Sequence, residues 1–415
     1  MMRLIILLLV AAMSWPLQAR LRADYSMETG LELRAYPQDA LEPEQTDGLV
    51  SLRLEPEAYW AWGPRRVHSV TASLFGRLDS ADDERTHADI RELIYAYRGR
   101  SLEFRFGISR VFWGATESIH LVDIINQTDF VENPDAEDKL GQPMAAVSWI
   151  SGFGTATAYL LPYFRERRFP GDEGRFRFIA PPVDQGSGLP LRVNTDESNY
   201  ESEREQQHLD WALRWTHSFS GIDLGLSHFS GTARNPTLIP VPVPAGQNPP
   251  DAIELQPFYG LLEQTGLDAT AVFGGLLAKL EVVYRDDFSD RYAAAAGGVE
   301  YTLSGILDSA WDMGLLAEYL WDERGKSQFS SPFDNELFLG TRLAGNDIAG
   351  TEILAGGAVD LDTQSTFFTV EASRRFGPDW KGVLELRAFS AVPTGDPLYS
   401  FSRDDYLSVE LIRYF

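Results

Sequence analysis

The sequence predicts an all-β fold: an antiparallel transmembrane β-barrel of about 18 strands (16 possible), with short periplasmic turns and long extracellular loops. Three observations lead to this prediction. Apolar and polar residues alternate in many windows, short and long connections alternate along the chain, and the last residues form an alternating strand that ends on Phe415. A helix cannot place residues i and i+2 on one face, so the alternating windows are predicted strands.

Residues 1–19 are expected to form a cleaved secretory signal peptide. Arg3 gives a positive start, residues 4–13 are an unbroken apolar run, and Ala19 is a small residue at a plausible cleavage point. The apolar run is too short to span a membrane as a helix. We therefore expect export to the bacterial outer membrane, with residues 20–415 forming one barrel domain.

The composition fits a sheet that has one lipid-facing side and one wet side. The chain has no cysteine, so disulfides and thiolate metal sites are excluded, and no residue cluster demands a cofactor or a metal. The formal net charge of −25 disfavours nucleic acid as a partner, because phosphate backbones repel an acidic protein. The acidic charge either keeps long loops soluble, or lets the surface bridge lipopolysaccharide through divalent cations, or makes the lumen attract cations. The outer membrane and its lipopolysaccharide are expected partners.

The clearest alternating window is residues 207–219. One face is apolar apart from His217, and it holds Leu209, Trp211, Leu213, Trp215 and Phe219. The windows 48–61, 101–112 and 276–285 alternate in the same way. Each is therefore a predicted barrel strand.

Connections between the predicted strands alternate in length. Eight are short: 63–66, 98–100, 151–152, 220–221, 274–275, 304–309, 345–349 and 377–378. The nine between them are mostly longer and richer in acid or proline: 37–47, 79–86, 113–142, 165–206, 231–257, 286–290, 323–333, 361–363 and 391–402. Within these, the proline-rich residues 235–251 are expected to be a stiff, extended surface loop. Eight turns and nine loops predict 18 strands with both chain ends on the periplasmic side.

Residues 403–415 are the predicted last strand. Leu407, Val409, Leu411 and Phe415 lie on one face, and Arg413 stands where an apolar residue is expected. A terminal aromatic residue on an alternating strand resembles the signal that outer-membrane barrels present to the barrel-assembly machinery. That machinery is therefore an expected partner.

One internal stretch resembles a known family. Residues 91–114 form a predicted hairpin that ends in Arg105, Gly107, Trp113 and Gly114, spaced as R-x-G-x-x-x-x-x-W-G. Glu117 and the Val122-Asp123-x-x-Asn126 stretch follow. Over about 40 residues this is similar to proteobacterial porin-like outer-membrane barrels, a largely uncharacterised group whose layout is similar to alginate-export and phosphate-selective porins. The resemblance implies a transport barrel and transfers no substrate.

Charged residues of both signs fall on the face opposite the predicted lipid face. The candidate ion or solute pathway consists of Arg53, Glu55, Glu57, Glu103, Arg105, Asp210, Arg214, Lys279, Glu281, Arg285, Glu385 and Arg387. These charges either guide an ion or polar solute through a wet lumen, or pair with one another across neighbouring strands. Arg105 with Glu92 or Glu103 is expected to be a structural pair of the second kind.

Loop 113–142 is the candidate constriction. Its acidic residues are opposed only by Lys139, and those selected are Glu117, Asp123, Asp129, Glu132 and Asp135. Two interpretations stay open: a loop folded into the lumen that selects cations, or an external acidic loop at the lipopolysaccharide layer. A calcium site at residues 133–138 is a weaker third, since the segment lacks the oxygen spacing and the glycine of a dedicated loop.

Loop 165–206 begins with a basic half that includes Arg165, Arg168 and Arg175, and then turns acidic. Its basic half either binds anionic groups or pairs with acidic residues of the same long loop.

The function that the sequence predicts is a porin-like channel for ions or small polar solutes that favours cations. The alternatives are a barrel enzyme acting on lipid or surface polymer, a partner-dependent export barrel, and a secreted soluble β-protein. His120 with Asp123 is the one pair that an enzyme hypothesis could use, because no nucleophile-elbow Gly-x-Ser-x-Gly and no His-x-x-x-His occurs. We therefore expect no enzyme activity.

Overall fold

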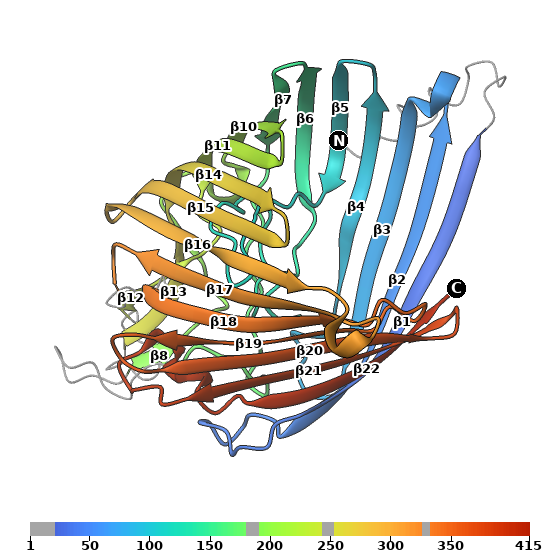
Figure 1. The fold of residues 1–415 in the computed structure, drawn as a ribbon. Coiled ribbons are helices and arrows are strands. Elements are labelled where there is room, and N and C mark those ends of the chain that lie inside the picture. The colour runs from blue at the N-terminus through green and yellow to red at the C-terminus, as the bar shows by residue number, and fades with distance from the viewer. Residues whose placement is uncertain (1–20, 180–190, 243–252, 326–332) are drawn as a thin grey trace.

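Eighteen antiparallel strands close into one barrel in the computed structural model (Figure 1), which describes residues 21–179, 191–242, 253–325 and 333–415. The barrel strands are β1 (Arg22–Ala35), β2 (Gly48–Trp62), β3 (His68–Asp79), β4 (His87–Arg98), β5 (Leu102–Ser109), β6 (Gln142–Ser151), β7 (Gly154–Leu161), β10 (Asp210–Phe219), β11 (Ile222–Thr232), β14 (Leu261–Phe273), β15 (Leu276–Asp287), β16 (Arg291–Leu303), β17 (Asp312–Asp322), β18 (Asn335–Ala344), β19 (Glu352–Asp360), β20 (Thr366–Phe376), β21 (Trp380–Ser390) and β22 (Tyr406–Tyr414). The predicted count of 18 is confirmed, and the alternative of 16 is wrong.

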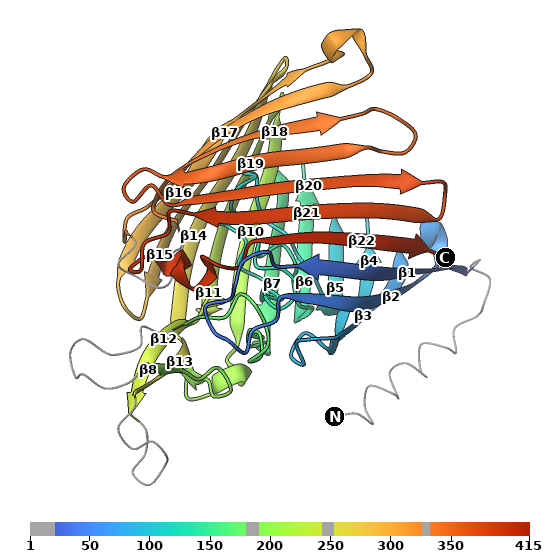
Figure 2. The ribbon, with the colours of Figure 1, turned by 90° about the horizontal axis from the view of Figure 1, so that it is seen from below.

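The barrel closes where the first strand meets the last. Strand β1 pairs with β2 on one side and with β22 on the other, with Leu33 opposite Val409. Figure 2 shows β1 and β22 side by side, with the C-terminus at this seam. No strand of the barrel sheet therefore keeps an open edge, which is the condition for a β-structure to sit in lipid.

The two faces of the wall differ sharply in polarity. In β1, Leu31 and Leu33 are 48% and 53% exposed on the outside, whereas Glu32 and Arg34 are only 4% and 7% exposed. The same alternation recurs around the wall, because successive side chains of a strand point to opposite faces. An apolar outer band around a charged interior is the reverse of a soluble β-sandwich and fits a barrel in lipid.

A second, four-stranded sheet lies beyond one end of the barrel, at the lower left of Figure 1. It contains β8 (Leu191–Val193), β9 (Asn199–Tyr200), β12 (Thr237–Pro242) and β13 (Ile253–Tyr259). Within the segment 235–251, expected to be a stiff, extended surface loop, residues 237–242 are extended and pair as strand β12 of this sheet. Proline is tolerated there because β12 pairs with β13 alone and so forms an edge strand of this sheet.

In the part of the chain that the structure describes, the remaining elements are four short 3₁₀ helices: η2 (Pro64–Arg66), η3 (Glu205–Gln207), η4 (Ile306–Asp308) and η5 (Pro397–Phe401). None of the described helices is long and apolar enough to cross a membrane. The predicted signal peptide, residues 1–19, lies outside the described residues, as do parts of the predicted loops 165–206, 231–257 and 323–333.

Candidate functional site

The connection between β5 and β6 lies inside the barrel. It spans residues 110–141, close to the predicted 113–142, and we call it the inner connection. Trp113, Val122 and Ile125 are at most 3% exposed and belong to one apolar cluster with wall residues such as Tyr159 and Val283. A loop that ran over the outer surface would leave these side chains in water.

Two carboxylates of the wall hold the first half of the inner connection. Glu281 on β15 accepts hydrogen bonds from the backbone N–H groups of Ala115 and Thr116 at 2.6 and 3.0 Å, and from that of Val122 at 3.1 Å. Glu318 on β17 accepts from the N–H groups of residues 117 and 118, both at 2.8 Å. A buried carboxylate is costly without donors, so these amides and the two wall residues stabilise one another.

Cationic residues of the wall hold the second half of the inner connection. Asp129 accepts hydrogen bonds from Arg91 at 2.6 Å and from His87 at 3.2 Å, both on β4. Burial alone raises the pKa of Asp129, but these two hydrogen bonds outweigh burial and hold the pKa below its usual range. Glu132 pairs with Arg77 on β3 at 2.7 Å. The inner connection is thus tied to the wall on β3 and β4 as well as on β15 and β17.

The other acidic residues predicted for the constriction are also paired. Asp135 pairs with Arg387 on β21 at 2.6 Å, and Glu117 pairs with Arg342 on β18 at 2.7 Å. Asp123 pairs with Lys139 of the same connection at 3.1 Å. The predicted acidic loop is therefore largely neutralised by its surroundings.

His120 occupies a position between two carboxylates. Its Nδ1 lies 3.8 Å from Glu281, and its Nε2 lies 3.8 Å from Glu137. Burial lowers the pKa of His120, but the two carboxylates outweigh burial and raise the pKa to about 9. His120 and Asp123 thus have different partners, and none of the described side-chain contacts makes them the pair that an enzyme hypothesis needs.

Most predicted pathway residues lie on the inner face in ion pairs or hydrogen bonds. Arg53 pairs with Glu410 at 2.9 Å and also with Glu55. The further contacts are Arg214 with Asp268 at 2.8 Å, Asp210 with Arg234 at 2.7 Å, Lys279 with Glu117 at 3.2 Å, Arg285 with Gln264 at 2.7 Å, and Glu385 with Arg387 at 2.7 Å. Glu57 is exposed, and Glu103 is half-buried.

Arg105 corrects one expectation. Its guanidinium lies 5.9 Å from the ring centroid of Tyr159 and donates to the hydroxyl of that tyrosine at 3.4 Å. No described contact joins it to Glu92 or Glu103. The aromatic face of Tyr159, two strands away, offers the cation an alternative to a neighbouring carboxylate.

The sequence interpretation missed a buried cluster of charges beside the inner connection. Glu32 on β1 pairs with Arg34 at 2.8 Å, with Arg77 at 2.6 Å and with Arg85 at 2.8 Å. A polar cavity of about 260 Å³ lies here, between the inner connection and strands β1–β3 and β21–β22. The Leu31–Glu32–Leu33–Arg34 alternation could have placed Glu32 and Arg34 on the inner face. Arg85 lies in the connection after β3, so no periodicity points to it.

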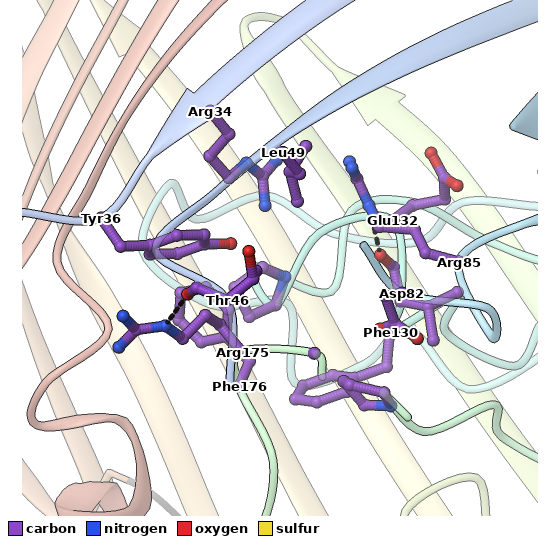
Figure 3. A pocket seen from close by; sticks show the side chains of 14 residues that line it. Arg34, Tyr36, Thr46, Leu49, Asp82, Arg85, Phe130, Glu132, Arg175 and Phe176 are labelled. Carbon is purple, nitrogen blue, oxygen red and sulfur yellow. Dashed lines mark hydrogen bonds between the residues drawn. The ribbon is translucent and has the colours of Figure 1, made fainter. Parts of the chain in front are cut away.

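A second connection, between β7 and β10, lines a pocket with Arg175 and Phe176, together with Arg34 of the wall and Phe130 of the inner connection (Figure 3). Arg175 is buried, donates to the Thr46 carbonyl at 2.6 Å and pairs with Asp404 at 3.3 Å. Phe176 packs its ring 5.7 Å from those of Phe401 and Tyr406. Arg175 therefore stabilises contacts among the long connections and is not available to an external anion.

The predicted calcium segment, residues 133–138, also binds to the wall. Asn133 donates to Glu385 at 3.2 Å, and Asp135 is paired with Arg387. The carboxylates of Asp135, Glu371 and Glu385 approach within 4.8 Å, but the Arg387 guanidinium contacts all three. A cation at this point would have to displace Arg387.

No known protein family matches the chain, and no curated protein matches it. Among solved structures, a mutant of the Rh. blastica porin is 13% identical over 95% of this chain and 100% of that chain, with a TM-score of 0.44. In-vitro folded OmpT, an outer membrane protein of Vibrio cholerae in its trimer form, is 10% identical over 95% of this chain and 99% of that chain, with a TM-score of 0.46. Similarity at this level carries no conclusion about the function of the present chain. The resemblance noted in the sequence stays a prediction.

Proposed function

We propose that the chain is an outer-membrane channel for ions or small polar solutes, narrowed by the inner connection. The single observation that supports this most is the attachment of the inner connection to the wall at Glu281 and Glu318 on one side and at Arg77 and Arg91 on the other. A segment held at both sides stays in the lumen, whereas a segment held at one side is free to swing out.

The width of the barrel supports an aqueous interior. Side chains alone cannot fill a closed sheet of 18 strands, so space remains for water unless connections occupy it. Beside the inner connection, the polar cavity of about 260 Å³ has a mostly charged lining, including Arg53, Glu55 and Glu410. A solute that passes the inner connection there meets charges of both signs.

A preference for cations is the finer part of the proposal. Most acidic residues of the inner connection are buried in ion pairs, so the preference rests on carboxylates of the connection and the wall that face water even where a cation contacts them. The side chains of Glu137 and Glu371 are 68% and 47% exposed, and Asp138 is also exposed. A net excess of such carboxylates in their charged form concentrates cations along the path. Desolvation and neighbouring carboxylates raise the pKa of Asp138 to about 7, so its contribution to this charge grows above neutral pH.

We also propose that lipopolysaccharide surrounds the long connections and that the barrel-assembly machinery binds the last strand. Strand β22 ends at Tyr414, and its outer face carries Leu407, Val409 and Leu411, each between 43% and 46% exposed. Arg413 lies over the rings of Trp380 and Phe415, which accounts for a cation on the otherwise apolar outer face of this strand.

Planar-bilayer recording of the refolded mature chain tests the channel. We expect discrete conductance steps and a reversal potential of the cation-selective sign in a salt gradient. Folding is checked independently by heat-modifiable mobility on detergent gels. Folded protein that gives no steps contradicts the proposal, and steps without cation selectivity contradict its finer part alone.

A further inference from the structure

The turns at the short-turn end of the barrel carry very uneven charge. Arg65 and Arg66 lie in the turn between β2 and β3, and Arg100 lies in the turn between β4 and β5. The other six turns, residues 152–153, 220–221, 274–275, 304–311, 345–351 and 377–379, contain no lysine or arginine. In a chain with a net charge of −25, these three arginines form a local basic corner.

The two basic turns are neighbours. The Arg98 N–H donates to the Val67 carbonyl at 2.7 Å, and His68 lies opposite Tyr97 in the β3–β4 register. Arg65, Arg66 and Arg100 are exposed, and no described carboxylate lies within ion-pair distance of any of them. Arg374, near another turn of the same end, is by contrast paired with Asp347 at 3.2 Å.

The backbone of the first turn is costly for the residues that occupy it. Arg65 and Arg66 both have φ of 57°, the left-handed region that glycine and asparagine adopt more easily. Folding alone gives no reason to keep arginine at these two positions. Glycine or asparagine would adopt this backbone more easily, but neither would supply a guanidinium group.

An aromatic cluster lies on the outer, lipid-facing surface next to these turns. The His68 ring stacks on Trp62 at 5.8 Å and lies 5.3 Å from Tyr97, and its Nδ1 is 2.8 Å from the Tyr95 hydroxyl. Tyr95 and Tyr97 share the outer face with Leu93, which is 49% exposed. Aromatic side chains at a barrel rim mark the level of the lipid headgroups.

We propose that Arg65, Arg66 and Arg100, with this aromatic cluster, bind the phosphate headgroup of an anionic phospholipid in the periplasmic leaflet. Guanidinium groups bind phosphate oxygens in bidentate geometry, and the aromatic rings hold the glycerol region at the membrane interface. The inference rests on the proposed outer-membrane location, since short turns face the periplasm in such barrels. A lipid suits this corner better than an acidic protein, because the rings lie on the wall surface that meets the acyl chains.

The test uses the folded mature chain in neutral detergent, titrated with phosphatidylglycerol or phosphatidylcholine of the same acyl chains and followed by native mass spectrometry. We expect at least fivefold tighter binding of phosphatidylglycerol, since one arginine near an anionic lipid surface contributes about fivefold. The triple variant R65N/R66N/R100N is expected to bind both lipids equally. Asparagine tolerates positive φ, so this variant keeps the turn and the fold.

Arg98 provides the matched control. It lies in the same corner, but its guanidinium donates inward to the Ser69 hydroxyl at 3.0 Å. R98N is therefore expected to keep the lipid preference. A triple variant that retains the preference, or an R98N variant that loses as much of it, overturns the proposal. Glycerol 1-phosphate that displaces the lipid at equal concentration overturns it in favour of a free-phosphate site, and polyglutamate that binds where phosphatidylglycerol does not points to an acidic protein instead.

If the proposed outer-membrane barrel itself is wrong, the lipid titration gives a different result from the one expected when only the headgroup site is wrong. A chain that is not a membrane barrel shows no heat-modifiable mobility and takes up neither lipid. A folded barrel without the headgroup site takes up both lipids equally before any substitution is made.

Discussion

At the scale of single residues, a few wall side chains determine where the inner connection lies. Glu281 is fully buried, and three backbone amides and the Thr116 hydroxyl donate to it. Such a carboxylate is stable only while its donors stay in place, and the donors lie on a segment without regular secondary structure. Local order of the inner connection therefore depends on a small number of charged acceptors.

Glu281→Gln is expected to loosen the inner connection. The glutamine amide replaces one acceptor oxygen by an N–H₂ group that faces other donors, which costs about 1–3 kcal/mol of local stability. Single-channel recording is expected to show larger and noisier steps than in the wild type. Glu263→Gln is the control, since Glu263 pairs with His228 on the outer face of the wall, away from the lumen. Equal conductance in Glu281→Gln and the wild type contradicts the anchoring role.

His120 predicts a defined pH dependence. With its pKa raised to about 9, it is protonated at neutral pH and attracts Glu281 and Glu137. A raised folded-state pKa contributes stability that is complete below the unfolded pKa of about 6.5 and is lost as the pH rises through the folded value. The difference in urea midpoint between the wild type and His120→Gln is therefore expected to be largest at acidic pH and to vanish in strong alkali. A difference that does not change with pH would count against the ion pair.

At the scale of elements, the inner connection and the second sheet have opposite relations to the barrel. The inner connection contributes four residues to the apolar cluster with the wall, Trp113, Val122, Ile124 and Ile125. Among the described strands, β12 and β13 pair with each other and with β8 and β9 alone, beyond the barrel. Removal of the inner connection should change the lumen, whereas removal of the β12–β13 hairpin should not.

Replacement of residues 115–137 by a short glycine–serine linker is expected to raise single-channel conductance several-fold. The wall should still close, because its ladder pairs β5 with β6 independently of what joins them. Deletion of the β12–β13 hairpin is the matched control and should leave conductance unchanged. Equal effects of the two deletions would show that the inner connection does not limit the pore.

At the scale of the whole molecule, selectivity depends on the carboxylates that face water, whether or not a cation also contacts them. The triple variant E137Q/D138N/E371Q removes exposed carboxylates and is expected to shift the reversal potential in a salt gradient toward equal permeability for cations and anions. The control variant D196N/E203Q/E205Q removes the same number of exposed acidic residues from connection 162–209 and should change the reversal potential little. If both variants behave alike, the preference comes from the overall negative charge rather than from the lumen.

The sequence predicted the wall better than the interior. Period-two alternation placed Arg53, Lys279 and Arg387 on the inner face correctly, because side-chain direction in a strand is a local property. The partners of the inner connection could not be predicted, since pairs such as Arg77–Glu132 join segments that only the closed barrel brings together. Strand β12 was not predicted as a strand because it contains Pro240 and Pro242, and proline-rich segments are usually irregular. Proline is tolerated in an edge strand, but the edge position depends on tertiary structure.

The seam between β1 and β22 also sets the order of events during assembly. Ser408 donates to Glu32 across 376 positions of the chain. Strand β1 therefore gains its second neighbour only after β22, the last strand, has joined the sheet. Until then both ends of the growing sheet offer unpaired backbone groups, and exposed sheet edges recruit other chains. Biogenesis therefore has a vulnerable interval whose length depends on the delivery of the final strand, and a chain that stops before β22 should aggregate or be degraded rather than persist as a smaller pore.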